Sequence, residues 1–124
     1  MRLLLDTHLL LWALATPAKI PARARDLVND NEVFVSAASI WEISIKSALG
    51  KLTADPVEVL AGLEPAGFLV LPVTGEHAAA AAGLPPVPRD PFDRLLIAQA
   101  RFEPMRLLTN DRTLEAYGEP VLVV

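Results

Sequence analysis

The chain has 124 residues, no cysteine, two histidines and a formal net charge of −4. These numbers exclude a disulfide framework and a thiolate nucleophile, and they argue against a zinc site. The length corresponds to a single domain, residues 1–124, with one hydrophobic core. Hydrophobic residues make up 52% of the chain and the mean hydropathy is +0.38. That is high for a small chain, so we expect part of the apolar surface to face a partner.

Alternating apolar runs and amphipathic segments predict strands and helices in turn. The predicted elements, in chain order, are a strand over 2–6, a helix over 7–15, a helix over 21–30, a strand over 32–35, a helix over 36–52, a short helix within 53–65, a strand over 68–72, a helix over 74–83, a loop over 84–90, a helix over 90–102, a strand over 105–108, a short helix after 110 and a strand over 120–124. This alternation predicts a three-layer α/β/α sandwich around a mainly parallel sheet of about five strands. Pro72 places the strand over 68–72 at or near an edge of the sheet.

No segment is expected to enter a membrane. The longest uncharged runs, 7–18 and 77–88, are shorter than the roughly 18–20 residues that cross a bilayer. Residues 1–18 have the outline of a signal peptide, but Asp6 interrupts the apolar region. We therefore expect a cytoplasmic protein.

Two acids follow predicted strands directly. Asp6 stands where the first strand gives way to a helix, and Asp111 follows the fourth strand. Sites in open parallel sheets gather at the carboxyl ends of strands, which makes both positions candidates. A structural alternative exists for each, because Asp6 suits a helix N-cap and either Asn110 or Asp111 could cap the next short helix.

Two further acids open the helix over 90–102. Asp90 suits its N-cap and Pro91 its first position, while Asp93 lies in the first turn. Asp90 and Asp93 are three residues apart and share one helical face. Capping and a favourable interaction with the helix dipole would explain both residues without any chemistry.

Glu42 lies in an unusually apolar part of the helix over 36–52, which Ser36 is expected to cap and Gly50 to end. Two structural interpretations compete for this acid: a capping box with Ser39, or an ion pair with Lys46 at i, i+4. An acid among isoleucines and a tryptophan is costly unless a positive charge meets it, which favours a functional role.

Taken together, these acids predict a metal site. Bare carboxylates about 4 Å apart repel by roughly 1–4 kcal/mol per pair, so a cluster needs protons or a cation. Oxygen ligands prefer Mg²⁺ or Mn²⁺, and such an ion can activate water for attack on a phosphodiester. The net acidity does not exclude a nucleic acid substrate, because eleven basic residues would face ten acids outside the site. The acids in question are Asp6, Glu42, Asp90, Asp93 and Asp111.

Three other polar residues are interpreted as structural. His8 is expected to be packed or at the solvent edge, and His77 to lie on the surface. Arg94 is expected to be an exposed helix arginine, with contact to a substrate or an inhibitor as the alternative.

Four segments in order, LLLDTHLLLWAL, VSAASIWEISIKSALGKL, RDPFDRLLIAQA and LLTNDRTLEAYG, resemble the PIN-domain ribonucleases, and most of all the VapC-type toxins of toxin–antitoxin pairs. The resemblance spans nearly the whole chain. It implies an RNA endonuclease that leaves a 5′-phosphate, forms a homodimer and is silenced by a cognate antitoxin in its active-site groove.

The same resemblance implies the roles of individual residues. It makes an acidic quartet that holds one or two Mg²⁺ or Mn²⁺ ions of Asp6, Glu42, Asp93 and Asp111. It makes Asp90 an auxiliary acid, and it makes Thr7 and Thr109 hydroxyls that steady the site; ordinary capping is the alternative for both threonines.

Other proteins of this size fit less well. A phosphoaspartate receiver would need an acidic pair after the first strand and a lysine near the last, and a haloacid-dehalogenase-type phosphatase would need an aspartate where His8 stands. The remaining non-enzymatic alternative is a PIN-fold module that binds RNA or protein without cutting.

Overall fold

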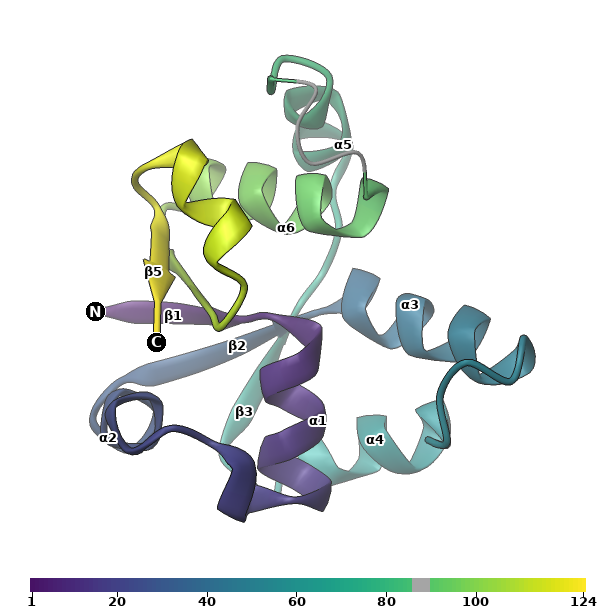
Figure 1. Cartoon of the computed structure of the whole chain (residues 1–124). Helices are drawn as coiled ribbons and strands as arrows, with labels where there is room; N and C mark the ends of the chain where they lie inside the picture. The colour runs from purple at the N-terminus through teal and green to yellow at the C-terminus, as the bar shows by residue number, and fades with distance from the viewer. Residues whose placement is uncertain (86–89) are drawn as a thin grey trace.

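Five parallel strands form the centre of the molecule (Figure 1). The structure is a computed structural model that describes residues 1–85 and 90–124. The strands are β1 (Arg2–Leu5), β2 (Glu32–Ser36), β3 (Phe68–Leu71), β4 (Arg106–Thr109) and β5 (Val121–Val123). They lie in the order β3-β2-β1-β4-β5, and each neighbouring pair is parallel. The predicted parallel sheet is confirmed, and β3 is an edge strand as Pro72 indicated.

Helices connect the strands and cover both faces of the sheet. They are α1 (Thr7–Ala15), η1 (Pro17–Lys19), α2 (Ala22–Asp30), α3 (Ala37–Ala48), α4 (Pro56–Leu63), α5 (Gly75–Ala81), α6 (Pro91–Phe102) and η2 (Arg112–Tyr117). Of the loop predicted over 84–90, residues 86–89 lie outside the described part of the chain. Within that part, no helix has the length and apolar character to cross a membrane.

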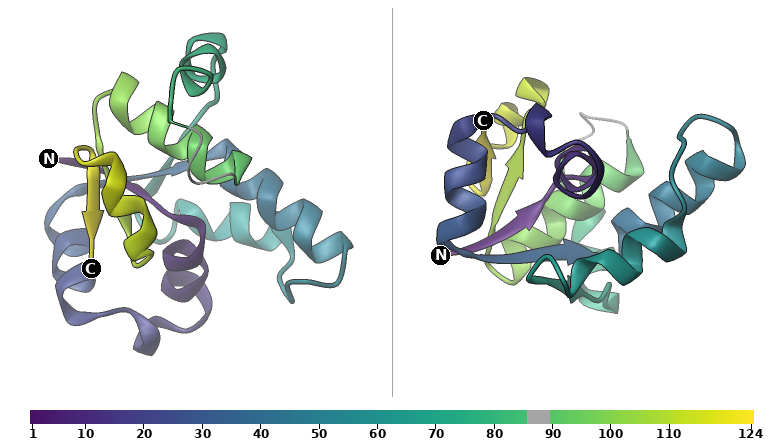
Figure 2. Two further views of the ribbon diagram at one scale, coloured as in Figure 1. Left: turned by 45° about the horizontal axis from the view of Figure 1, so that its top comes forward. Right: turned by 90° about the horizontal axis from the view of Figure 1, so that it is seen from below.

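Alternate residues of β1 enter two separate cores. Leu3 and Leu5 pack with residues of α1 to α4, whereas Leu4 packs with residues of α6 and η2 on the opposite face. Because successive side chains of a strand point to opposite faces, a wholly apolar strand is needed where both faces are covered. Figure 2 shows the resulting three layers from two further directions, and the predicted sandwich is confirmed.

The chain turns in opposite directions from β1. Its neighbours are β2 on one side and β4 on the other, so the strand order reverses at the middle of the sheet. In open parallel sheets this switch point leaves a crevice at the carboxyl ends of the strands. Asp6 is fixed there, because its backbone N–H continues the ladder with the Leu108 carbonyl at 2.9 Å.

Most of the predicted helix boundaries are correct because the cap residues act as their types suggest. Asp55 and Thr74 cap α4 and α5, and Ser36 caps α3, accepting from the Ala38 N–H at 3.0 Å. The Ser39–Glu42 capping box is therefore wrong, since the helix starts three residues earlier. Gly50 follows the end of α3 with φ 74°, a conformation that glycine adopts without steric cost.

Two structural interpretations of polar residues are wrong. His77 is fully buried: its Nδ1 accepts from the Thr74 N–H at 3.1 Å, and its Nε2 lies 2.6 Å from Glu103 Oε2, which links α5 to the end of α6. Arg94 is not a free surface arginine, because its guanidinium donates to backbone carbonyls at the end of α5 and beyond, among them Ala81 O at 2.9 Å. His8 is exposed, as expected.

Candidate active site

Asp6 is a buried carboxylate with two fixed hydrogen bonds. Its Oδ1 accepts from the Thr7 N–H at 2.7 Å, which caps α1, and its Oδ2 accepts from Thr109 Oγ1 at 2.6 Å. Only 5% of the residue is exposed. The Thr109 hydroxyl also accepts from the Asp111 N–H at 3.0 Å. The side chains of Asp6 and Thr109, both candidates from the sequence, thereby join the ends of β1 and β4.

Glu42 reaches the same region from α3. It is 6% exposed, and its Oε1 accepts from Thr7 Oγ1 at 2.7 Å. Ser39 Oγ lies 3.0 Å from the same threonine hydroxyl. The other carboxylate oxygen, Oε2, lies 2.5 Å from Lys46 Nζ. The predicted Glu42–Lys46 ion pair is thus present, and it lies within the candidate site.

Asp90 and Asp93 lie at the start of α6. Asp90 Oδ1 accepts from the Phe92 N–H at 2.8 Å and from the Asp93 N–H at 3.3 Å, the geometry of an N-cap. The Asp93 carboxyl lies close enough to the other acids for their charges to act on it. On the flank of the site, the ring of Phe92 meets that of Trp41 edge-on, with the centroids 5.6 Å apart, and connects α6 to α3.

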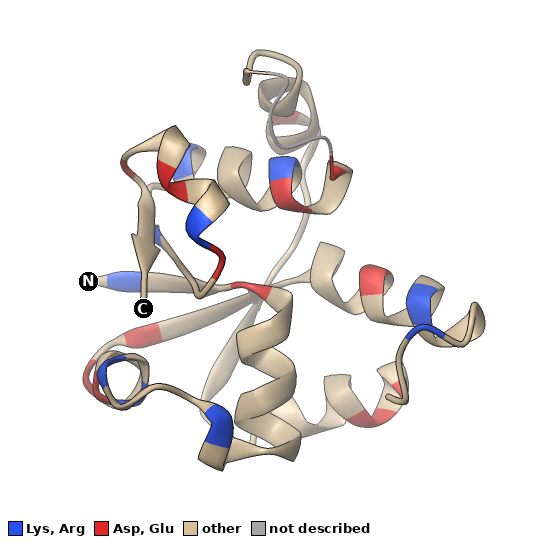
Figure 3. Ribbon diagram, in the orientation of Figure 1, with Lys and Arg blue, Asp and Glu red and all other residues tan. Residues whose placement is uncertain are grey.

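Asp111 has the smallest effect of the neighbouring acids on the pKa of Asp93. It caps η2, with Oδ1 accepting from the N–H and the hydroxyl of Thr113 at 3.0 and 2.7 Å. Of the two predicted cap candidates, Asp111 rather than Asn110 fills the role. Figure 3 shows the ribbon segments that carry acidic residues at the start of α1, on α3, at the start of α6 and before η2.

The pKa of Asp93 depends on the charges of the neighbouring acids. The pKa of Asp93 rises from 3.8 to about 7, first because the carboxyl is partly buried and then because Asp6, Asp90, Glu42 and Asp111 repel its charge. A carboxyl that senses four other acids lies in a cluster with too little positive charge to balance it. Strongly shifted groups of this kind concentrate at functional sites.

The same imbalance affects Asp6. Burial raises its pKa, and the charge of Glu42 adds to the increase, whereas the hydrogen bonds from Thr109 and Thr7 and the charge of His8 counteract it. The Thr109 hydroxyl and the Thr7 N–H therefore favour the ionised form of Asp6.

The donor set suits a hard divalent cation in its chemistry, since it consists of carboxylates and hydroxyls. The side chains, however, are not gathered tightly around one point. Among the described residues, no three histidine, aspartate or glutamate side chains are grouped closely enough to hold one ion. Glu42 in particular has both oxygens engaged, one by Thr7 and one by Lys46.

Ser39 and Lys46 are site residues that the sequence does not predict as such. In the sequence they indicate structural alternatives for Glu42, a capping box with Ser39 or an ion pair with Lys46. Their spacing from Glu42, three residues before it and four after it, already placed them on its face of the helix. The fold then brings that face against Thr7 and Asp6.

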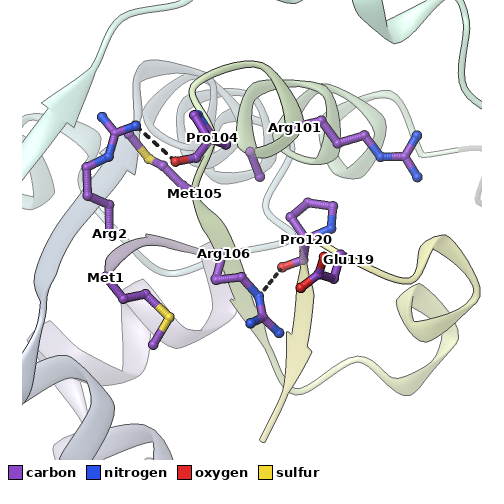
Figure 4. Close-up of a pocket in the computed structure, with 9 residues that line it drawn as sticks. Met1, Arg2, Arg101, Pro104, Met105, Arg106, Glu119 and Pro120 are labelled. Atoms are coloured by element: carbon purple, nitrogen blue, oxygen red, sulfur yellow. Dashed lines mark hydrogen bonds between the residues drawn. The ribbon is translucent and has the colours of Figure 1, made fainter.

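A cavity of about 420 Å³ lies at the opposite edge of the sheet, where β1 and β4 begin (Figure 4). Arg2, Arg101 and Arg106 line it, and each donates to a backbone carbonyl: Pro104 O at 2.9 Å, Tyr117 O at 3.0 Å and Pro120 O at 3.2 Å. These arginines fasten the chain segments around the sheet and take no part in the acidic cluster.

Comparison with known proteins agrees with this architecture. Residues 3–120 match the PIN domain family. The chain is 31% identical over 121 residues to "Ribonuclease VapC22" of Mycobacterium tuberculosis, covering 94% of this chain and 92% of that protein.

Two solved structures share the fold. A toxin–antitoxin complex from Klebsiella pneumoniae has a chain with a TM-score of 0.68 and 14% identity, covering 97% of this chain and 95% of that one. VapBC2 from Rickettsia felis, bound to a DNA fragment from its promoter, has a TM-score of 0.65 and 14% identity, covering 100% and 98%. The chain thus belongs to the PIN-domain family, and within it to the VapC-type proteins.

Proposed function

We propose that this protein is a Mg²⁺- or Mn²⁺-dependent endoribonuclease and the toxin of a toxin–antitoxin pair. The observation that carries the proposal is the gathering of acids at the carboxyl ends of the strands, where Thr7 binds both Asp6 and Glu42 and Thr109 binds Asp6. Repulsion by the other acids helps to raise the pKa of Asp93 to about 7. A folded protein gains nothing from such repulsion, whereas a divalent cation would relieve it. The 31% identity to a protein named as a ribonuclease supports RNA as the substrate.

The proposed chemistry divides the work among the acids. Asp6, Asp93, Glu42 and Asp111 would hold the ion, with Asp90 as an auxiliary acid that sets the first turn of α6. A bound Mg²⁺ or Mn²⁺ would lower the pKa of a water molecule and offset the charge of the phosphate. The hydroxyls of Thr109 and Thr7 would position Asp6 and Glu42, respectively, for this role.

The partners are part of the same proposal. Exposed apolar residues gather on α3 and α4, where Trp41, Val57 and Leu60 are 63%, 73% and 48% exposed and line a cavity of about 380 Å³. Apolar patches of this kind mark protein contacts. Together with the toxin–antitoxin complexes that share the fold, they support an antitoxin as a partner. A second copy of the chain as a further partner and a location in the cytoplasm complete the proposal.

The test is cleavage of RNA by purified protein in the presence of Mg²⁺, Mn²⁺ or EDTA. We expect cleavage with either metal, none with EDTA, and none with the Asp93→Asn variant, whose amide cannot supply a negative charge. Asp55→Asn is the matched control: it makes the same change at the N-cap of α4, outside the cluster, and asparagine also caps helices.

Two results would contradict the proposal. Cleavage that survives EDTA, or that is equal in Asp93→Asn and the parent, excludes the metal mechanism. RNA that binds to the parent and is never cut, with any divalent metal, favours the alternative of a non-catalytic binding module.

A further inference from the structure

Lys46 lies inside the acidic cluster. It is one helical turn beyond Glu42 on α3, with its Nζ 2.5 Å from Glu42 Oε2. The side chain of Glu42 is only 8% exposed, whereas that of Lys46 is 32% exposed. Removing the ammonium from such a pair leaves a buried carboxylate without its counter-charge, which costs more than breaking a solvent-exposed i, i+4 pair.

The charge of Lys46 extends beyond its partner. The hydrogen bond to Glu42 raises the pKa of Lys46, and the charges of Glu42, Asp90 and Asp93 add to this against the opposing effect of burial. Within residues 1–85 and 90–124, Lys46 is the basic side chain that forms an ion pair with these acids; the other ion pair, His77–Glu103, links α5 to α6. The cluster thus already contains one cation of its own.

That cation stands where a metal ion would bind to Glu42. Oε1 of Glu42 accepts one hydrogen bond from Thr7 and Oε2 accepts one from Lys46, so an ion bound at Oε2 would lie against the Lys46 ammonium.

We propose that Lys46 is the resident counter-cation of the cluster: it positions Glu42 and competes with divalent ions for that carboxylate. The inference rests on the proposed function for the identity of the competing ion. Lys46 is a positioning residue, since it acts through Glu42. It stabilises the metal-free protein and lowers the affinity for the ion.

The first test is the thermal stability of the metal-free protein. In Lys46→Met the acids lose their counter-cation, so we expect a lower melting temperature in EDTA and recovery with added Mn²⁺. Lys51→Met is the matched control. Lys51 is an exposed lysine just beyond α3, so this substitution removes the same charge outside the cluster. Equal melting temperatures of Lys46→Met and Lys51→Met in EDTA would overturn the proposal.

The second test is Mn²⁺ binding by isothermal titration calorimetry. Removing one positive charge from the neighbourhood of a divalent ion should tighten Mn²⁺ binding by about tenfold or more, given Coulomb energies in a surface dielectric. We expect Lys46→Met to gain this affinity, while Lys46→Arg, which keeps the charge, and Lys51→Met bind like the parent. Equal or absent Mn²⁺ binding in Lys46→Met and the parent contradicts the competition.

The melting temperature and the Mn²⁺ affinity test the role of Lys46 independently of RNA cleavage. If the parent cuts no RNA but Lys46→Met is destabilised in EDTA and binds Mn²⁺ more tightly, the role of Lys46 holds and the nuclease assignment falls. If the parent cuts RNA and Lys46→Met matches it in both measurements, the reverse is true.

Discussion

The two central strands, β1 and β4, carry opposite charges at their two ends. Each begins with an arginine, Arg2 or Arg106, and an aspartate follows each, Asp6 directly after β1 and Asp111 two residues after β4. Because the strands are parallel and adjacent, like charges gather at each edge of the sheet. The amino edge therefore has a cavity lined by arginines (Figure 4), and the carboxyl edge has the acidic cluster.

The two edges balance their charges differently. The arginines donate to backbone carbonyls, which supply partial negative charge and fix each side chain. The acids accept from hydroxyls and N–H groups, but they also repel one another, and the pKa of Asp93 rises to about 7 in consequence. Backbone carbonyls balance the arginines at the amino edge, whereas the acids at the carboxyl edge lack enough positive charge to balance them.

The largest contrast is expected in catalysis. Asp6→Asn removes a buried charge from the carboxyl edge but keeps a side chain that can cap α1, so we expect a folded protein without measurable RNA cleavage. Arg106→Gln removes a charge at the amino end of the neighbouring strand and should cleave like the parent. Equal loss in both variants, measured in the same RNA assay with circular dichroism as the check on folding, would contradict the comparison.

Much of the fold could be predicted because local signals and tertiary structure agree. The cap residues Asp55, Thr74 and Asp90 start helices where their types predict, and the apolar run before Asp6 becomes a strand buried on both faces. The predicted surface position of His77 is wrong, because a short helix of mostly alanines gives no sign of which face is buried. Its partner, Glu103, is distant in sequence, and no periodicity reveals such a contact.

The candidate site was predictable for a related reason. Asp6 and Asp111 cap helices and Asp93 lies in the first turn of α6, so each can stabilise a helix start and still join the cluster. For these residues the structural and functional interpretations do not compete. Lys46 could not be placed in the same way, because an i, i+4 pair looks identical in sequence whether it is solvated or buried among other acids.

A smaller effect is expected from the hydroxyl that connects β4 to Asp6. Thr109→Val removes the 2.6 Å hydrogen bond to Asp6 Oδ2 at a fully buried position, which should cost about 1–3 kcal/mol of unfolding free energy. Thr109→Ser retains the hydroxyl and should recover most of it. Urea denaturation in EDTA measures both variants. A valine variant as stable as the parent would show that Asp6 does not depend on this bond.

Charge repulsion at the carboxyl edge should make the stability of the protein depend on pH. The pKa of Asp93 is about 7 in the folded chain against 3.8 as its ordinary value, so the folded state retains a proton that the unfolded state has lost between these pH values. Its contribution to stability therefore falls as the pH rises from about 4 to about 7 and is constant above that. Burial raises the pKa of Asp6 as well, which acts in the same direction.

Asp93→Asn isolates this contribution. In EDTA its melting temperature should match the parent near pH 4 and exceed it progressively up to about pH 7, because the variant carries no charge to be repelled. Asp55→Asn should follow the parent across the range. A constant difference between Asp93→Asn and the parent at all pH values would contradict the repulsion.

The smallest effect is expected at the amino edge. Arg2→Met keeps most of the aliphatic stem but removes the donor to Glu103 O and Pro104 O, at 2.7 and 2.9 Å, beyond the end of α6. Because this contact is partly exposed, we expect a loss of about 1 kcal/mol of unfolding free energy, equal with and without Mn²⁺. Arg23→Met, on the exposed side of α2, is the control and should change nothing. A loss at Arg2 that depended on Mn²⁺ would mean that the two edges are coupled through β1, and their division into a structural and a functional edge would fail.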